Sequence, residues 1–171
     1  MSVRFVIDPL DFVRNAGVRR DKIPVFQLTR LHDLLYDQEG EVTYQISGYF
    51  DNNNKPVLCL EITGSIHLSC QRCLDKLTKT IDLQTFLLLA ENEAELDLNN
   101  EEETMDAILA TPELDVWSLI EEEIILNLSI SSRHPEGMCK MHELISNEKD
   151  STKASHMSHP FAALAALKKI K

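Results

Sequence analysis

Apolar and polar residues alternate along three stretches in the first half of the chain. In residues 42–50 and 58–68 an apolar residue or a glycine occupies every second position, and the alternation returns in residues 81–89. A period of two residues places the apolar side chains on one face of a β-strand. Residues 51–56 separate the first two stretches and are rich in Asn with a terminal Pro, which favours a turn. The pattern predicts an antiparallel β-meander.

A helical period replaces the alternation further along the chain. Asp115 has the side chain of an N-cap and precedes residues 116–126, whose apolar positions fall near one helical stripe. This pattern predicts one main helix packed on the sheet, with Trp117 anchoring it and residues 121–123 partly facing water. Residues 29–36, with Thr29 as cap, predict a short second helix, and residues 7–13 an extended entry and a short helix. The predicted fold class is α+β.

The remaining segments define the domain organisation. Residues 91–103 are acidic without apolar periodicity and predict an irregular loop, whereas residues 104–109 predict a short strand or turn. We expect residues 1–145 to form a single α+β domain, followed by a flexible linker at residues 146–158. The sequence of residues 159–171 predicts a C-terminal helix. We expect this helix to dock on another surface, because so short a helix is only marginally stable alone in water.

Four residues have the types and spacing of a metal site. Cys70 and Cys73 enclose a two-residue knuckle between two predicted strands, and His134 and Cys139 lie in a loop punctuated by Pro and Gly. Three sulfurs and one nitrogen suit tetrahedral zinc, with His142 as an alternative to His134. The other interpretation is a set of reduced thiols without metal. Cys59 lies in the middle of a predicted strand, where a small sheet residue is expected.

Several function classes find little support in the sequence. The residues after Cys73 return to strand alternation, whereas a redox CxxC motif opens a helix. The sequence contains no nucleophile elbow, HExxH motif or phosphate loop, so we expect no enzyme and no small-molecule substrate. No apolar stretch approaches the roughly 20 residues that span a bilayer, and no secretory signal opens the chain. We therefore expect a cytoplasmic protein with reduced thiols and no membrane contact.

Four pieces of the sequence occur in a specific order: residues 7–9, the Cys70–Cys73 knuckle, residues 115–128 leading to His134 and Cys139, and residues 160–168. Together they resemble the YceD family of large ribosomal RNA subunit accumulation proteins. At residues 128–129 this chain has Leu-Ser where the family has Leu-Pro. The resemblance implies a role in the synthesis, processing or stability of large-subunit (23S) ribosomal RNA, by a non-catalytic mechanism. An RNA-processing enzyme with an unrecognised site is the alternative.

The distribution of charge leaves two kinds of partner open. The net charge is −11, yet residues 81–131 contain 14 acidic and no basic side chains, so the rest of the chain is slightly basic. A separate basic surface can then contact phosphates of ribosomal RNA or a pre-ribosomal particle. The candidate RNA-binding residues are Arg14, Arg19, Arg20, Arg72, Lys168, Lys169 and Lys171. The alternative is an adaptor whose acidic middle binds a basic ribosomal protein.

Overall fold

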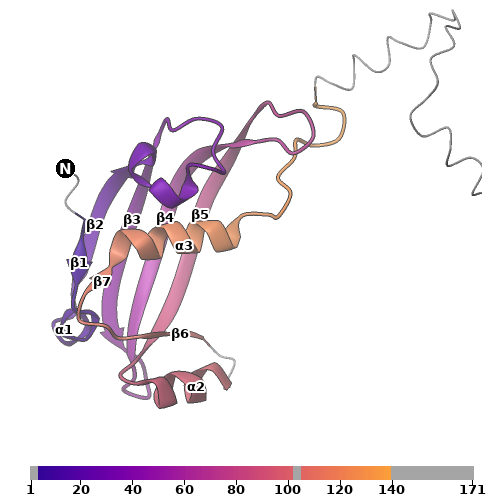
Figure 1. Cartoon of the computed structure of the whole chain (residues 1–171). Coiled ribbons are helices and arrows are strands. Elements are labelled where there is room, and N and C mark those ends of the chain that lie inside the picture. Colours follow the sequence, from indigo (N-terminus) through magenta and orange to yellow (C-terminus); the bar gives the residue numbers. More distant parts are fainter. Residues whose placement is uncertain (1–3, 102–104, 140–171) are drawn as a thin grey trace, which may run out of the picture.

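The computed structural model describes residues 4–101 and 105–139, which form a twisted sheet with one long helix across one of its faces (Figure 1). The sheet has the order β2-β3-β4-β5-β6, and a separate pair joins β1 to β7. The strands are β1 (Val6–Ile7), β2 (Val18–Pro24), β3 (Glu41–Phe50), β4 (Pro56–Ser69), β5 (Lys76–Ala90), β6 (Asp106–Leu109) and β7 (Leu114–Asp115). The α-helices are α1 (Pro9–Arg14), α2 (Glu93–Glu101) and α3 (Val116–Asn127).

The core lies between the sheet and α3. The inward side chains of β3 and β4 alternate with polar residues, as the sequence predicts, and they pack against the apolar side chains of α3. The fully buried positions include Tyr44, Ile46, Leu58, Leu60, Ile62, Ile120 and Ile124. The predicted α+β fold with one main packed helix is confirmed.

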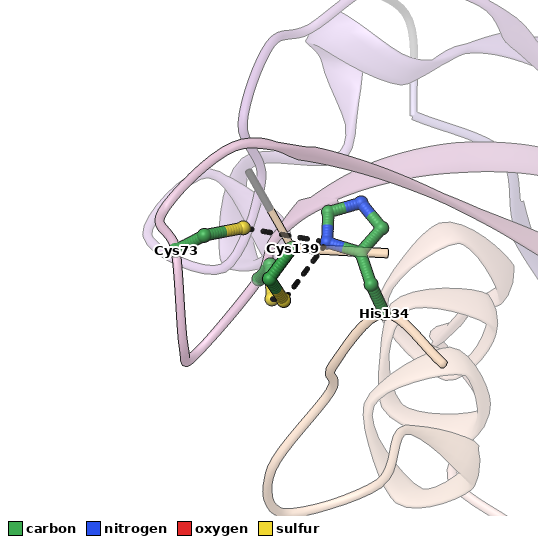
Figure 2. A group of neighbouring side chains, drawn as sticks. Cys73, His134 and Cys139 are labelled. Carbon is green, nitrogen blue, oxygen red and sulfur yellow. Dashed lines mark hydrogen bonds between the residues drawn. The ribbon is translucent and has the colours of Figure 1, made fainter. Parts of the chain in front are cut away.

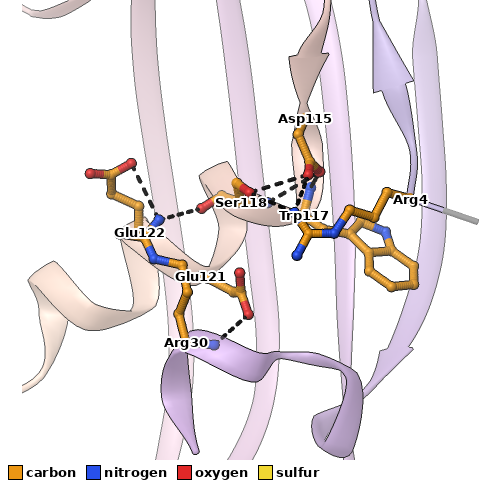
Figure 3. Close-up of polar contacts among 7 residues, drawn as sticks. All are labelled: Arg4, Arg30, Asp115, Trp117, Ser118, Glu121 and Glu122. Carbon is orange, nitrogen blue, oxygen red and sulfur yellow. Dashed lines mark hydrogen bonds and ion pairs between the residues drawn. The ribbon is translucent and has the colours of Figure 1, made fainter. Parts of the chain in front are cut away.

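Helix α3 begins where the sequence predicts it. The Asp115 carboxylate accepts hydrogen bonds from the backbone N–H groups of Trp117 and Ser118, and it pairs with Arg4 at 2.7 Å (Figure 3). These contacts satisfy N–H groups that have no partner within the helix. Trp117 is half-buried against the core, as predicted for a residue that anchors the helix.

The predicted helix at residues 29–36 is wrong. This segment contains only a 3₁₀ turn at Thr29–Leu31, after another at Val25–Gln27, and Thr29 makes no side-chain cap. The segment then turns toward β4, where the Tyr36 N–H donates to the His67 carbonyl at 2.7 Å and Leu35 bridges Leu68. Because β3 ends its pairing at Gly64, this contact occupies the rest of that edge of β4. A long-range backbone contact therefore overrides the helical spacing of the leucines.

The predicted irregular loop at residues 91–103 is also wrong, because most of it forms α2. The Asn92 side chain accepts from the Glu95 N–H at 3.0 Å, and the Glu95 carboxylate accepts from the Glu91 N–H at 2.9 Å. Acidic residues in the first turn also suit the positive end of the helix dipole. A polar helix of this kind depends on capping and lacks the apolar stripe from which helices are predicted.

The sheet extends beyond the predicted meander on both sides. Strands β2 to β5 are antiparallel, but β6 pairs with β5 in parallel, which corrects the expectation of a purely antiparallel sheet. The prediction of a strand or turn at residues 104–109 is confirmed by β6. Strand β2 was not predicted, because Ile23 is its only fully buried side chain.

One carboxylate of α3 differs from the prediction that residues 121–123 partly face water. Glu121 is only 2% exposed, and its carboxylate accepts from the Arg30 N–H at 2.9 Å (Figure 3). Glu122 is exposed and lies 3.8 Å from the Arg30 guanidinium. The prediction is wrong for Glu121, because the 3₁₀ turn at residues 29–31 covers this face of the helix.

Candidate metal centre

The four predicted ligands converge at one end of the sheet. One ligand atom from each of Cys70, Cys73, His134 and Cys139 lies within 4.8 Å of the others. The three cysteines are buried and His134 is half-buried. The prediction that these residues come together is confirmed. The knuckle pair and the loop pair are separated by about 60 positions in the sequence.

The knuckle owes its shape to the tight connection between β4 and β5. The Cys70 N–H donates to the Asp75 carbonyl at 3.0 Å, and the Leu74 N–H donates to the Cys70 carbonyl at 2.9 Å. Leu74 adopts a positive φ of 61°, which turns the chain back into β5. Both knuckle sulfurs are thereby held by a short hydrogen-bonded turn between two long paired strands.

The loop after α3 brings the other two ligands to the knuckle. The Gln71 N–H donates to the Ser132 carbonyl at 2.9 Å, which attaches the loop directly to the knuckle backbone. A turn then returns the chain, in which the Met138 N–H donates to the Pro135 carbonyl and Gly137 has a φ of +82°. This turn lies between the two ligand positions and allows His134 and Cys139 to face the same point.

The imidazole of His134 is oriented for coordination through Nδ1. Nδ1 lies 3.4 Å from the Cys73 sulfur and 3.8 Å from the Cys139 sulfur (Figure 2). The opposite nitrogen, Nε2, lies 3.1 Å from the Lys76 carbonyl oxygen. Because that carbonyl can only accept, Nε2 carries the proton and Nδ1 keeps a free lone pair. Metal-binding histidines usually have this kind of second contact.

The spacing of the donor atoms fits zinc. Donors about 2.3 Å (sulfur) or 2.0–2.1 Å (nitrogen) from a tetrahedral ion lie about 3.8 Å apart for two sulfurs and about 3.6 Å for sulfur and nitrogen. The Cys70 and Cys139 sulfurs are 3.8 Å apart, and the two sulfur–nitrogen distances of His134 bracket the expected value. The four residues therefore have the identity of a Cys₃His zinc site, and these three donor distances match its spacing.

The thiols influence one another's ionisation. Burial raises the pKa of Cys70, but hydrogen bonds from the backbone N–H groups of Cys73, His134 and Arg72 outweigh it and lower this pKa to about 5. For Cys73 the backbone N–H of Asp75 lowers the pKa, whereas burial and the Cys70 and Cys139 thiols raise it to about 11. The Cys70 thiolate is thus favoured, whereas Cys73 would need a nearby cation to hold it in the ionised form.

A polar group beside the centre was not predicted from the sequence. The Asp37 carboxylate accepts from Lys76 Nζ at 2.9 Å and lies 2.7 Å from His67 Nδ1. The hydrogen bond from Lys76, followed by that from His67, lowers the pKa of Asp37 to about 2. These residues come from three separate segments, so no local sequence motif predicts that they come together. It braces the start of β5, whose Lys76 carbonyl contacts His134.

The candidate RNA-binding residues that the structure describes lie in two separate places. Arg72 is exposed at the knuckle, whereas Arg14, Arg19 and Arg20 are exposed on α1 and β2. In the sheet register Arg19 lies level with Leu60 of β4, which is roughly 30 Å along that strand from the knuckle. Arg14 pairs with Asp11 and Arg19 pairs with Asp21, so acidic neighbours partly neutralise this group.

The remaining predicted site residues are quickly placed. Cys59 is buried in β4, where Gln84 Nε2 lies 3.8 Å from its sulfur, and it takes no part in the cluster. His142, Lys168, Lys169 and Lys171 lie outside the described residues, as do the predicted linker and terminal helix. Sequence reasoning missed Arg133, which is exposed next to Ser132 and therefore close to the knuckle backbone.

The family model for the large ribosomal RNA subunit accumulation protein YceD matches residues 58–168, which is more than half of the chain. The chain belongs to the YceD family. The matched part of this YceD-family chain contains all four residues of the metal centre. A comparison with solved structures finds no match. Within the described ranges, no helix has the length and apolar character needed to cross a membrane.

Proposed function

We propose that this YceD-family protein is a non-catalytic factor that supports the accumulation of large-subunit ribosomal RNA, and that zinc in its Cys₃His centre is structural. The observation that carries the proposal is the convergence of four ligand atoms within 4.8 Å of one another. The family is named for the accumulation of large-subunit ribosomal RNA. The four cysteines of this chain are buried and form no disulfide, which suits the reducing cytoplasm, where ribosomes are assembled.

The ligand set favours a structural role over catalysis. A catalytic zinc keeps one coordination position open for water or substrate, whereas a structural zinc is enclosed by four protein ligands. Here three sulfurs and Nδ1 of His134 supply all four positions. The zinc would supply only cross-linking of the two chain segments, and the residues around it would do the binding.

The cross-link would create a rigid basic surface at the knuckle. Arg72 follows Gln71 and Arg133 follows Ser132, and these two neighbours are joined by a backbone hydrogen bond. Both arginines are exposed, so their guanidinium groups can contact phosphate oxygens from adjoining backbone segments. Folded RNA is recognised largely through its shape and backbone, which a rigid pair of arginines can read.

Elemental analysis of the full chain, purified without a metal-binding tag, tests the metal centre. We expect one zinc per chain, lost in Cys70→Ser and retained in Cys59→Ser. Cys59 is a matched control because it is also buried but lies outside the cluster. A parent protein without zinc, or equal loss in both variants, would contradict the structural zinc.

Charge reversal tests the RNA surface separately. We expect Arg72→Glu with Arg133→Glu to weaken binding to a large-subunit ribosomal RNA transcript by roughly tenfold or more and to reduce its salt dependence. The matched control is Arg19→Glu with Arg20→Glu, which removes the same charge from the opposite region. If only the control pair weakens binding, the RNA surface lies on β2 and the knuckle is purely structural.

A further inference from the structure

Strand β5 has a long edge that no described strand covers. β5 runs from Lys76 to Ala90 and pairs with β4 along almost its whole length. On the other side β6 pairs only with Leu87–Ala90, so residues 77–86 have no strand beside them among residues 4–101 and 105–139. In a strand, alternate N–H and C=O groups point to each side, so this edge presents backbone groups that no strand in the described part of the chain pairs with.

A groove follows this open edge. It has a volume of about 450 Å³ and lies between β5 and the last turns of α3, with Leu83 and Thr85 of β5 among its lining residues. Leu126 of α3 also lines it and is 74% exposed. Asp106, the first residue of β6, lies at the groove as well. An added strand would therefore lie in the sheet position that β6 begins, with apolar side chains against Leu83 and Leu126.

The charges around the groove are acidic. Glu123 and Asp106 line it, and no Lys or Arg does. Asp82 is exposed on the same strand. The whole stretch of residues 81–131, from which the groove is built, contains no basic residue. An extended segment that pairs with residues 81–86 of β5 is therefore favoured when it carries positive charge, whereas Lys79 lies in the part of the open edge that precedes the groove.

We propose that the open edge of β5 binds an extended, basic segment of a partner protein by strand addition, with its apolar side chains in the groove. Main-chain hydrogen bonds to the edge provide affinity, and the acidic rim selects for Lys and Arg. This site goes beyond the proposed function, because it uses neither the metal centre nor Arg72. A second copy of this chain is a poorer occupant, because two acidic grooves would face each other.

Methylation of a probe peptide tests strand addition directly. The probe is a ten-residue peptide of alternating Lys and Val, and the control peptide has Glu in place of Lys. Two further versions carry backbone N-methyl groups on all Val residues or on all Lys residues. Because only alternate N–H groups face the sheet edge, we expect one methylated version to bind at least tenfold more weakly and the other to bind within twofold of the parent. The Glu peptide should not bind.

Two exposed positions on the full chain provide matched variants. Leu126→Lys places a positive charge in the groove and should weaken binding of the Lys-Val peptide at least tenfold. Ile130→Lys makes the same change at a fully exposed residue outside the groove and should alter binding less than twofold. Neither side chain is buried, so both variants should fold like the parent. Equal effects of the two variants, or of the two methylation patterns, would reduce the binding to general charge attraction and overturn the proposal.

The free protein distinguishes other occupants of the edge. Among residues 77–86, the amides that point away from β4 should exchange rapidly in the free full chain and slowly with the peptide bound. Slow exchange in the free chain at low concentration would mean that the edge is already occupied from within the chain. A dimer in sedimentation experiments that Leu126→Lys abolishes would assign the edge to a second copy. Either result would overturn the proposed partner, whatever the zinc content.

Discussion

The two ends of β4 are held in different ways. Near its start, Leu58, Leu60 and Ile62 are fully buried in the large apolar core beneath α3. Beyond its end, Cys70 belongs to a separate small cluster of three cysteines with Leu77 packed against it. The first end is stabilised in proportion to the apolar surface area that it buries, and such a core tolerates apolar substitutions that conserve volume. Ile66 and Leu68, near the end of β4, still belong to the large core, but the cysteine cluster beyond them depends on a few directed contacts. We therefore expect this cluster to respond to metal and redox chemistry that does not affect the core.

Metal removal should produce the largest difference in stability between the two regions. The proposed zinc ion would join the knuckle to the loop after α3 and close a chain loop of roughly 60 residues. Releasing a loop of that length costs about 4 kcal/mol in the entropic estimate. We therefore expect chelation to lower the free energy of unfolding by about that amount, measured by denaturant titration. Amide exchange should accelerate at residues 70–76 and 129–139 and remain slow at residues 58–62. Equal acceleration in both regions would mean that the two ends form one cooperative unit.

A change confined to the core end provides the reverse test. A Cβ atom added at Gly48 of β3 would lie 2.9 Å from Val13 Cα of α1, which is backbone and cannot rotate away. We expect Gly48→Ala to destabilise the fold by about 1–3 kcal/mol while leaving the zinc content unchanged. Ser47→Ala, one residue away on the other face, should cost less than about 0.5 kcal/mol. Zinc loss in Gly48→Ala alone would show that the core end controls the metal centre.

The buried carboxylate of Glu121 on α3 should have a smaller effect on stability than the metal. Glu121→Ala would remove the acceptor of the Arg30 N–H and leave that donor without its partner at the helix surface. Loss of the acceptor of a buried donor costs about 1–3 kcal/mol, and because this bond is part-buried we expect the lower end of that range. Glu122→Ala is the matched control, since its side chain is exposed and its ion pair should contribute well under about 1 kcal/mol. Equal destabilisation by both variants, measured by thermal unfolding, would refute a specific role for Glu121.

The sequence predicted the elements that pack one face on the core and missed those that bury little. Alternation in β3 and β4 predicted their positions because each strand packs one whole face on the core. β2 lies at an edge and buries little more than Ile23, so its sequence carries no alternating signal. The helix predicted at residues 29–36 was wrong because a backbone bond between Tyr36 and His67 decides that segment. For α2 a local signal did exist, in the spacing of Asn92 and Glu95, but it concerns capping and not burial.

The candidate metal centre was predicted more completely than the fold around it. The spacing of the cysteines singled out Cys70, Cys73 and Cys139 as ligands, because zinc restricts the number and types of its ligands. For the fourth ligand the sequence left His134 and His142 as alternatives. The orientation of His134 could not be predicted, because its Nε2 contact is to the Lys76 carbonyl, a backbone group. The group of Asp37, His67 and Lys76 also has no sequence signature, since three segments must fold before it exists.

That polar group should give the smallest effect and a characteristic dependence on pH. Hydrogen bonds from Lys76 and His67 lower the pKa of Asp37 from 3.8 to about 2 in the folded protein. The folded state therefore binds its proton less readily than the unfolded state, so the carboxylate stabilises the fold above the unfolded pKa. This contribution is lost as the pH falls through 3.8 toward 2.

The difference in unfolding free energy between the parent and Asp37→Asn should accordingly be larger at pH 5 than at pH 2, and should shrink below about pH 4. Roughly molar salt should also reduce it, because these side chains are partly exposed and salt screens them. Glu39→Gln is the control, because Glu39 is 80% exposed and lies 4.0 Å from Lys76. A difference that grows as the pH falls would mean that Asp37 is destabilising as a carboxylate. The brace at the start of β5 would then depend on shape and not on charge.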